Sequence, residues 1–279
     1  MQLSIAQHRL DLAWPHIMGI LNVTPDSFSD GGRFVGRDSA LRQAEQMLHD
    51  GASIIDIGGE STRPGAQAVC EQEELDRVIP VIEAVAELGA AISVDTSKAA
   101  VMRSAVAAGA GMINDVNALL GEGTLATAAR LDVPVCLMHM QGQPRSMQQQ
   151  PVYGDVVEEV GAFLEQRAKA CIAAGMAREH IVLDPGFGFG KTVQHNLQLL
   201  QKLEQLHKFA YPLLVGLSRK SMLGVVTGKP VAQRLAGSLS AAVIAAVKGA
   251  QIIRVHDVDA TRDALKVVYA TQMGENYHD

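Results

Sequence analysis

The chain is poor in aromatic residues and has no excess of positive charge. Only 4% of its 279 residues are Phe, Trp or Tyr, whereas 48% are hydrophobic, so Ala, Val, Ile, Leu and Gly must fill the core. That composition is typical of parallel sheets covered by helices. The formal net charge of -6 argues against a nucleic-acid partner, because proteins that bind nucleic acids carry a basic surface. An anionic small substrate would need cations gathered locally.

Long apolar runs and paired cysteines are also missing. No apolar run approaches the roughly 18 residues that cross a bilayer, so we expect no membrane partner. The N-terminal MQLSIAQHRLDLAWPH lacks the basic region and apolar stretch of a signal peptide. The three cysteines, Cys70, Cys136 and Cys171, are odd in number and form no CxxC pair. We therefore expect reduced thiols in a cytoplasmic protein.

One pattern recurs along the chain: an amphipathic segment, a Gly-Ala pair, a short apolar run and a polar residue. It occurs in DGASIIDIGG, AGAGMINDV and KGAQIIRVHD. The glycine can close a helix in the left-handed conformation, and the short β-branched run suits a strand buried on both faces. With HIMGILNV and the variants AAISVDTS, VPVCLMHM, HIVLDPG and YPLLVGLS, the pattern predicts eight strands.

Helical periodicity lies between these strands. It predicts helices over residues 39–49, 71–88, 98–108, 123–131, 155–173, 193–207, 231–248 and 260–272. Strand followed by helix, eight times, predicts an α/β fold: a parallel (β/α)8 TIM barrel that forms a single domain over residues 1–279. A doubly wound open sheet is the alternative, since periodicity does not show closure. Residues 1–13 precede the first strand, and we expect a short hairpin across the bottom of the barrel.

Polar side chains follow every predicted strand. They are Asn22, Asp56, Asp95, Asn114, Asp115, His139, Asp184, Ser218, Arg219, Lys220, Ser221, Arg254, His256 and Asp257. Any single strand meets polar residues as it leaves the core. Eight such ends in one direction converge on one mouth of a barrel, where active sites lie. Most of these side chains are short, so they hold fixed positions.

These groups also sort by charge. Asp95, Asn114 and Asp184 follow middle strands, whereas Asn22, Arg254 and His256 follow the first and last strands, which are neighbours in a closed barrel. Arg63 and Lys220 come from adjoining loops. The cations suit an anion such as phosphate, and ionised carboxylates accept hydrogen bonds only. A ligand with a donor-rich head and a phosphorylated tail would match both sides.

Two other motifs can be dismissed, whereas three residues keep two interpretations. GFGFGKT ends like a phosphate-binding P-loop, but Pro185 stands where that motif needs glycine. HDVD at His256 has no second histidine at a zinc spacing. His139 is a candidate ligand, although a hydrogen-bonded wall residue is the more common role. Phe187 and Phe189 are either core residues or rings that close on a flat ligand.

Eight motifs together identify a family. They are GILNVTPDSFSDGG, DIGGESTRPGA, SVDTSK, INDV, LMHMQGQP, LDPGFGFGK, LLVGLSRKS and IIRVHDV. From Ile17 to Val258 the chain resembles the bacterial dihydropteroate synthases, pterin-binding enzymes of folate biosynthesis. The resemblance implies that 6-hydroxymethyl-7,8-dihydropterin diphosphate and p-aminobenzoate give 7,8-dihydropteroate and diphosphate. It also implies that sulfonamides compete for the p-aminobenzoate site.

The resemblance assigns roles to single residues. It implies a pterin subsite of Asp95, Asn114, Met138, Asp184, Gly188, Phe189 and Lys220. It implies a diphosphate subsite of Asn22, Arg63, Arg254 and His256, with Mg²⁺ held at Asn22 and Asp26. It implies a p-aminobenzoate subsite of Phe28, Thr62, Arg63, Pro64, Phe189, Lys220 and Ser221.

The implied chemistry is a transfer in which diphosphate departs early. Mg²⁺ prefers oxygen ligands and substrate phosphates, and it neutralises charge on the leaving diphosphate. The pterin methylene can then carry cationic character, which Asp30 or Asp26 could stabilise. The catalytic residues implied by the resemblance are Asn22, Asp95, Lys220, Arg254, His256 and Asp30.

Two other functions and one partner remain to be weighed. A methyltransferase that moves a methyl group from methyltetrahydrofolate to a corrinoid shares the barrel, but it does not need the diphosphate cations. A non-catalytic pterin-binding barrel is the second alternative. The resemblance suggests a homodimer, and the Ala-rich GSLSAAVIAAVKGA helix could pack a second copy. Burial of that helix against the barrel is an equally good interpretation.

Overall fold

The computed structural model describes residues 1–24, 33–61, 68–142, 147 and 151–274. Within them, eight parallel strands lie in the order β8-β7-β6-β5-β4-β3-β10-β9. Their bounds are β3 (His16–Asn22), β4 (Ile54–Gly58), β5 (Ile92–Asp95), β6 (Met112–Asp115), β7 (Val135–Met138), β8 (Ile181–Asp184), β9 (Leu214–Val215) and β10 (Ile252–Val255). A parallel bridge between Leu183 and Leu213 joins the two outer strands. The sheet therefore closes into the predicted barrel rather than staying open.

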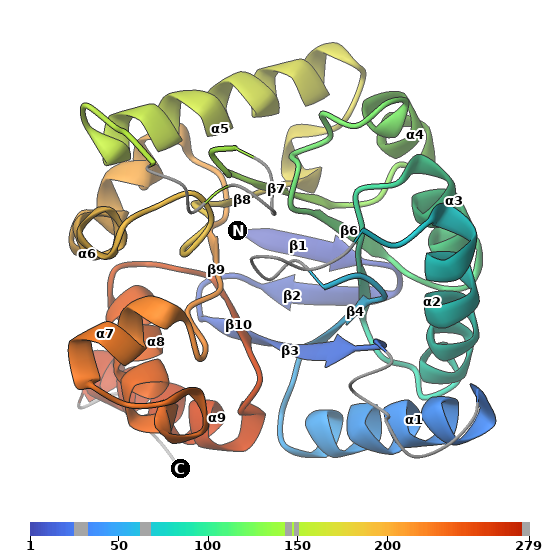
Figure 1. Ribbon diagram of the computed structural model, residues 1–279, viewed down its shortest axis with the longest axis horizontal. Helices are drawn as coiled ribbons and strands as arrows, with labels where there is room; N and C mark the ends of the chain where they lie inside the picture. Colours follow the sequence, from blue (N-terminus) through green and yellow to red (C-terminus); the bar gives the residue numbers. More distant parts are fainter. Residues whose placement is uncertain (25–32, 62–67, 143–146, 148–150, 275–279) are drawn as a thin grey trace.

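Helices surround this ring of strands (Figure 1). The α-helices are α1 (Arg33–His49), α2 (Glu71–Ala86), α3 (Ala99–Ala107), α4 (Thr124–Leu131), α5 (Val156–Ala173), α6 (Val193–Gln201), α7 (Ser221–Thr227), α8 (Leu235–Val247) and α9 (Val258–Met273). Short 3₁₀ turns are η2 (Arg178–His180), η3 (Leu203–Phe209) and η4 (Val231–Gln233). The helices bury their apolar faces on the outward side of the strands, in one continuous core that includes Ile55, Ile57 and Leu183.

The N-terminal segment forms the predicted hairpin. Strands β1 (Gln2–Ile5) and β2 (His8–Asp11) pair antiparallel, and Figure 1 shows them lying across the centre of the ring. Leu3 and Ile5 are fully buried. They join a second core with side chains from the lower ends of the strands, namely Met18, Ile54, Met112, Cys136, Val182, Leu214 and Ile252. The hairpin therefore closes the bottom of the barrel with an apolar plug.

The two cores reveal which way each strand residue points. Successive side chains of a strand alternate between its faces. Ile54 belongs to the inner core whereas Ile55 and Ile57 belong to the outer one, so Asp56 faces inward. The same alternation on β8 places Val182 and Asp184 inside the barrel. On β4 and β8 an apolar inward residue thus lies two positions below a polar one, whereas β7 carries the apolar Met138 at the upper position.

Some helix predictions are wrong in their bounds. Helix α1 begins at Arg33 rather than at residue 39, because Gly36 and Ser39 are tolerated inside it. The predicted helix 193–207 is divided at Lys202 into α6 and η3. The predicted helix 231–248 is divided at Arg234, whose guanidinium donates to the carbonyls of Lys229 and Arg219. Helix α7 was not predicted. The other helix ends differ from prediction by at most two residues.

Candidate active site

The upper inward residues of the strands bring most of the predicted site together. Register pairs Asn22 of β3 with Gly58, Gly58 with Asp95, and Asp95 with Asn114. These positions therefore share one level of the barrel, and Met138 and Asp184 share a level on β7 and β8. Asp95, Asn114 and Asp184 are buried, each at most 9% exposed. The carboxylates and the amide form a sheltered floor under the mouth of the barrel.

Arg254 of β10 links this floor to the cationic side. Its Nε donates to Asp56 Oδ2 over 2.6 Å, and its Nη2 donates to Asp95 Oδ2 over 2.7 Å. Asn114 Nδ2 donates to the same Asp56 oxygen over 3.1 Å. That bond uses the amide nitrogen of Asn114 and leaves its amide oxygen as the acceptor for a ligand. Asp56, which is fully buried, thus orients two predicted site residues at once.

The sequence analysis missed this role of Asp56. It marked Asp56 only as one of the polar residues that follow the strands, and gave it no subsite. The sequence signal for this role was that Asp56 stands two positions after Ile54, because residues two positions apart on a strand share a face. Its partner Arg254 lies 198 residues further along the chain, so the pair itself had no local signature.

Burial sets the charge states of this network. It raises the pKa of Asp95 to about 7; Arg254 opposes that rise and Asp56 adds to it. Burial also disfavours the charge of Arg254, but Asp56 and Asp95 outweigh it and raise the pKa of the guanidinium above its ordinary value. Arg254 is therefore a permanent cation, whereas Asp95 can gain or lose a proton near neutral pH.

Asp184 ends β8 with one oxygen already engaged. Its Oδ1 accepts the backbone N–H of Gly186 over 2.7 Å. Burial raises the pKa of Asp184, and the Gly186 hydrogen bond and the Lys220 charge oppose that rise. Met138, which is 3% exposed, is its register partner on β7. The sequence predicted both residues in the same subsite, and the structure places them on adjacent strands.

Lys220 and Phe189 meet although 31 positions separate them in the sequence. The Lys220 Nζ lies 4.1 Å from the centroid of the Phe189 ring, which is a cation–π contact. Gly188 has φ +80°, and a Cβ there would come within 3.1 Å of Lys220 Cδ. Burial lowers the pKa of Lys220 to about 8, while Asp184 opposes that shift. Gly188, Phe189 and Lys220 therefore form one wall, and the family resemblance predicts all three for the pterin subsite.

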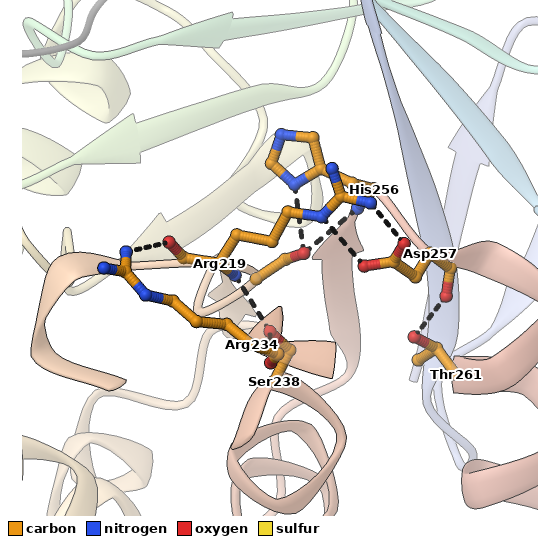
Figure 2. A network of polar contacts seen from close by, with 7 residues as sticks. Arg219, Arg234, Ser238, His256, Asp257 and Thr261 are labelled. Atoms are coloured by element: carbon orange, nitrogen blue, oxygen red, sulfur yellow. Dashed lines mark hydrogen bonds and ion pairs between the residues drawn. The ribbon is translucent and has the colours of Figure 1, made fainter. Parts of the chain in front are cut away.

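A network of polar contacts joins the loop after β9 to the end of β10 (Figure 2). Ser218 Oγ lies 3.0 Å from His256 Nδ1 and also accepts the His256 backbone N–H. The Arg219 guanidinium donates to both carboxylate oxygens of Asp257, at 2.5 and 3.1 Å. Ser238 Oγ of α8 accepts the Arg219 backbone N–H over 2.9 Å. His256 is thus held at the cationic end of the mouth, close in space to the loop that carries Lys220.

The remaining predicted residues lie at the periphery or outside the described chain. Ser221 is exposed as the first residue of α7, and Asn22 is half-buried as the last residue of β3. Six predicted residues lie outside the residues that the structure describes: Asp26, Phe28, Asp30, Thr62, Arg63 and Pro64. Among the described residues, no group of three or more His, Cys, Asp or Glu side chains could hold a metal ion.

Comparison with known proteins agrees with this architecture. Residues 18–256 match the family described as "Pterin binding enzyme". The dihydropteroate synthase of Haemophilus influenzae is 59% identical over 94% of this chain and 96% of that protein. The crystal structure of Yersinia pestis dihydropteroate synthase with a sulfonamide drug complex superposes with a TM-score of 0.94 and 55% identity, covering 98% of this chain and 100% of that one. The Xanthomonas albilineans dihydropteroate synthase in complex with 7,8-dihydropteroate superposes with a TM-score of 0.88 and 48% identity, covering 98% of this chain and 99% of that one.

The barrel with its polar mouth is therefore that of a pterin-binding enzyme, and the chain belongs to that family. Within it, the chain belongs to the dihydropteroate synthases, which are transferases.

Proposed function

We propose that this protein condenses 6-hydroxymethyl-7,8-dihydropterin diphosphate with p-aminobenzoate, giving 7,8-dihydropteroate and diphosphate. The observation that carries the proposal is the buried floor of Asp95, Asn114 and Asp184 beside Arg254. Ionised carboxylates and an amide oxygen accept hydrogen bonds, and a pterin ring presents several N–H donors. The permanent guanidinium beside them suits the anionic diphosphate.

The pterin ring is proposed to lie on this floor, against Met138, Gly188, Phe189 and Lys220. Phe189 offers an apolar face to a flat ring, and the Lys220 cation is already seated on that aromatic ring. A buried acceptor that faces a ligand without donors costs free energy, so these acceptors favour a donor-rich ring over a purely apolar ligand.

The diphosphate is proposed to lie between Asn22, Arg63, Arg254 and His256. A Mg²⁺ ion is proposed to arrive with the diphosphate, because Mg²⁺ keeps several waters and uses few protein oxygens beside substrate phosphates. Asn22 would hold it through its amide oxygen, together with Asp26. When bound, the ion neutralises negative charge on the diphosphate. Arg254 and His256 bind and orient the diphosphate in either case.

We propose that the carbon–oxygen bond to diphosphate breaks before the amine attacks. The methylene of the pterin would then carry positive charge, close to the Asp95 and Asp184 carboxylates and within reach of Asp30. Incubation without p-aminobenzoate should then release diphosphate slowly and give a water-trapped pterin alcohol. Diphosphate release that depends strictly on the amine would contradict this order of steps.

p-Aminobenzoate is proposed to bind outside the pterin, in the subsite of Phe28, Thr62, Arg63, Pro64, Phe189, Lys220 and Ser221. Ser221 begins α7 directly after Lys220, so one loop contacts both substrates. Sulfonamides share the amine and the ring of p-aminobenzoate, and we expect them to compete for the same subsite.

One incubation tests the function. Purified protein with the pterin diphosphate, p-aminobenzoate and Mg²⁺ should yield dihydropteroate and diphosphate in equal amounts. Pterin binding without product would indicate a non-catalytic barrel. Methyl transfer from methyltetrahydrofolate to a corrinoid would indicate the related methyltransferase instead.

We also propose a cytoplasmic homodimer. Cys136 and Cys171 are buried free thiols, as in proteins of reducing compartments. The consecutive elements α7, η4 and α8 expose large apolar side chains: Val225, Val226, Val231, Leu235, Ile244 and Val247. Exposed apolar patches of this kind mark association surfaces. Sedimentation velocity should give twice the mass of 29.7 kDa, and Val247→Glu should shift it to the single-chain value. A monomer in the wild type would contradict the proposal.

No helix among the described residues has the length and apolar character needed to cross a membrane.

A further inference from the structure

The lysine of the P-loop-like run GFGFGK points into the protein. Lys191 is 2% exposed. Its Nζ contacts Gly186 O at 2.9 Å, Phe189 O at 3.1 Å and His139 O at 3.3 Å. It also lies 2.9 Å from His139 Nδ1. An ammonium has three protons, so these four acceptors already exceed its donors. Lys191 is therefore not a phosphate ligand.

His139 completes this arrangement as a neutral acceptor. Burial, together with the neighbouring Lys191, lowers the pKa of His139 to about 3. The neutral ring can accept from the Lys191 ammonium at Nδ1 when Nε2 carries the proton. None of the four contacts of the Lys191 Nζ is to a carboxylate. Burial lowers the pKa of Lys191 to about 7 and Asp184 opposes that shift, so the amine is partly protonated near neutral pH. In its protonated form it occupies the position that a bound cation takes among backbone carbonyls.

The segment around this ammonium is a tight turn packed on the end of β7. Gly186 has φ +68°, and a Cβ there would lie 1.9 Å from His139 O, so only glycine fits. Asn196 of α6 supports the turn from its other side. It is 2% exposed, its Oδ1 accepts the Gly188 N–H over 2.7 Å, and its Nδ2 donates to Thr192 O over 2.7 Å. Two buried polar side chains therefore fix a short turn.

That turn carries groups of the proposed pterin subsite. Gly186 N–H donates to Asp184 Oδ1, which orients that carboxylate. The Phe189 carbonyl accepts from Lys191, while the Phe189 ring lies against Lys220. Any movement of the Lys191 ammonium would shift the backbone between Asp184 and Phe189.

We propose that Lys191, with neutral His139, is a positioning residue for the pterin subsite: its ammonium gathers three carbonyls and so sets the places of Asp184, Gly188 and Phe189. The inference rests on the proposed function, because it names a residue that acts through pterin-binding groups without touching the pterin. Neither the P-loop comparison nor the family resemblance assigned Lys191 a role. Its burial and its four contacts supply that role.

The test replaces Lys191 with Met, which keeps the volume of the side chain and removes its donors. We expect KM for the pterin diphosphate to rise about tenfold or more while kcat at saturation stays within about threefold, because binding geometry rather than chemistry is lost. Amide hydrogen exchange over residues 185–191 should accelerate about tenfold or more, because the turn loses its internal cation.

Leu199→Ala is the matched control. Leu199 is fully buried on α6, the same helix as Asn196, and it belongs to the outer core rather than to the turn. Its replacement lowers stability but should leave KM and exchange over 185–191 unchanged at 25 °C. If Lys191→Met left both quantities at their wild-type values, or if Leu199→Ala changed them equally, Lys191 would have no positioning role.

The two proposals fail in different ways. Absence of dihydropteroate with the wild-type protein would contradict the proposed function. The exchange measurement needs no substrate, so it still decides whether Lys191 holds the turn. Product from the wild type together with unchanged KM and exchange in Lys191→Met would contradict only the positioning role.

Discussion

Two residues of β8, Val182 and Asp184, both face the inside of the barrel but lie in different surroundings. Val182 is fully buried in the inner core with the N-terminal hairpin, whereas Asp184, two positions later, is a carboxyl at the mouth of the barrel. The same contrast runs from Ile54 to Asp56 on β4 and from Ile252 to Arg254 on β10. On these three strands the inward face packs the inner core at its lower residue and carries a charged group two positions above, where the substrate is proposed to bind.

We call the buried inward residues at the bottom of the strands, such as Val182, the lower layer, and the inward polar residues at the mouth, such as Asp95 and Asp184, the upper layer. The lower layer stabilises the fold, whereas burial of the upper layer opposes stability. Burial raises the pKa of Asp95 from 3.8 to about 7. A carboxyl whose pKa is raised in the folded state favours folding in its protonated form. Its contribution to stability is therefore fully present below pH 3.8 and is lost as the pH rises through about 7. Near neutral pH this part of the site is held in place by the rest of the barrel.

The largest expected effect is in the lower layer. Leu3→Ala should lower the free energy of unfolding by roughly 2–5 kcal/mol, because it opens a cavity in the plug of the barrel. kcat/KM at 25 °C should stay within about twofold, since the mouth is untouched. Urea unfolding and steady-state kinetics measure the two quantities, with the exposed Gln2→Ala as control. A loss of activity without loss of stability would break the division between the layers.

The next effect is in the upper layer of β8. Asp184→Ala should lower kcat/KM for the pterin diphosphate by an amount that corresponds to roughly 2–4 kcal/mol, as for loss of a charged partner of a buried hydrogen-bonding group. Asp38→Ala, at an exposed position of α1, is the control, and it should leave kcat/KM unchanged. Near-normal turnover of Asp184→Ala would mean that the pterin lies elsewhere.

Asp56→Asn should have a smaller effect. The amide keeps the volume of the side chain but weakens its bond to the Arg254 guanidinium, and a hydrogen bond to a charged group contributes roughly 1.5–3 kcal/mol. KM for the pterin diphosphate should rise, while KM for p-aminobenzoate should change by less than about twofold. Equal changes in the two KM values would show that Asp56 affects the whole site and does not act specifically through Arg254.

The smallest effect is a pH dependence. Burial lowers the pKa of Lys220 to about 8, so Lys220 is charged below that pH and neutral above it. If its charge supports binding, kcat/KM should fall up to tenfold per pH unit above about 8. Lys220→Arg keeps the charge at high pH and should remove this fall. Persistence of the fall in Lys220→Arg would assign it to another group.

The barrel and its polar mouth could be predicted because both have local signatures. Gly-Ala before a β-branched run predicts a strand, and a short polar residue after it predicts a site residue, as at Asp95 and Asp184. The break at Lys202 could not be predicted, because apolar spacing continues through it into η3. Helix α7 was missed because it is short and begins at Ser221, the last residue of the polar LSRKS segment.

Contacts between distant residues were also beyond the sequence. Pro185 already argues against a P-loop at Lys191, but only the contacts of Lys191 with His139, 52 positions away, show that the side chain faces inward. The pairing of Asp56 with Arg254 likewise exists only after the barrel closes. The spacing of residues did not decide whether Phe189 is a core residue or lies against a ligand. The resemblance to a known family assigned it to the pterin subsite.

The measurement that tests the division of the barrel most directly is kcat/KM for the pterin diphosphate in Val182→Ala and Asp184→Ala, made side by side at 25 °C. We expect a fall of about 30-fold or more for Asp184→Ala and a change within about threefold for Val182→Ala, because only the upper residue is proposed to contact the pterin. Equal falls in the two variants would contradict this division of the barrel.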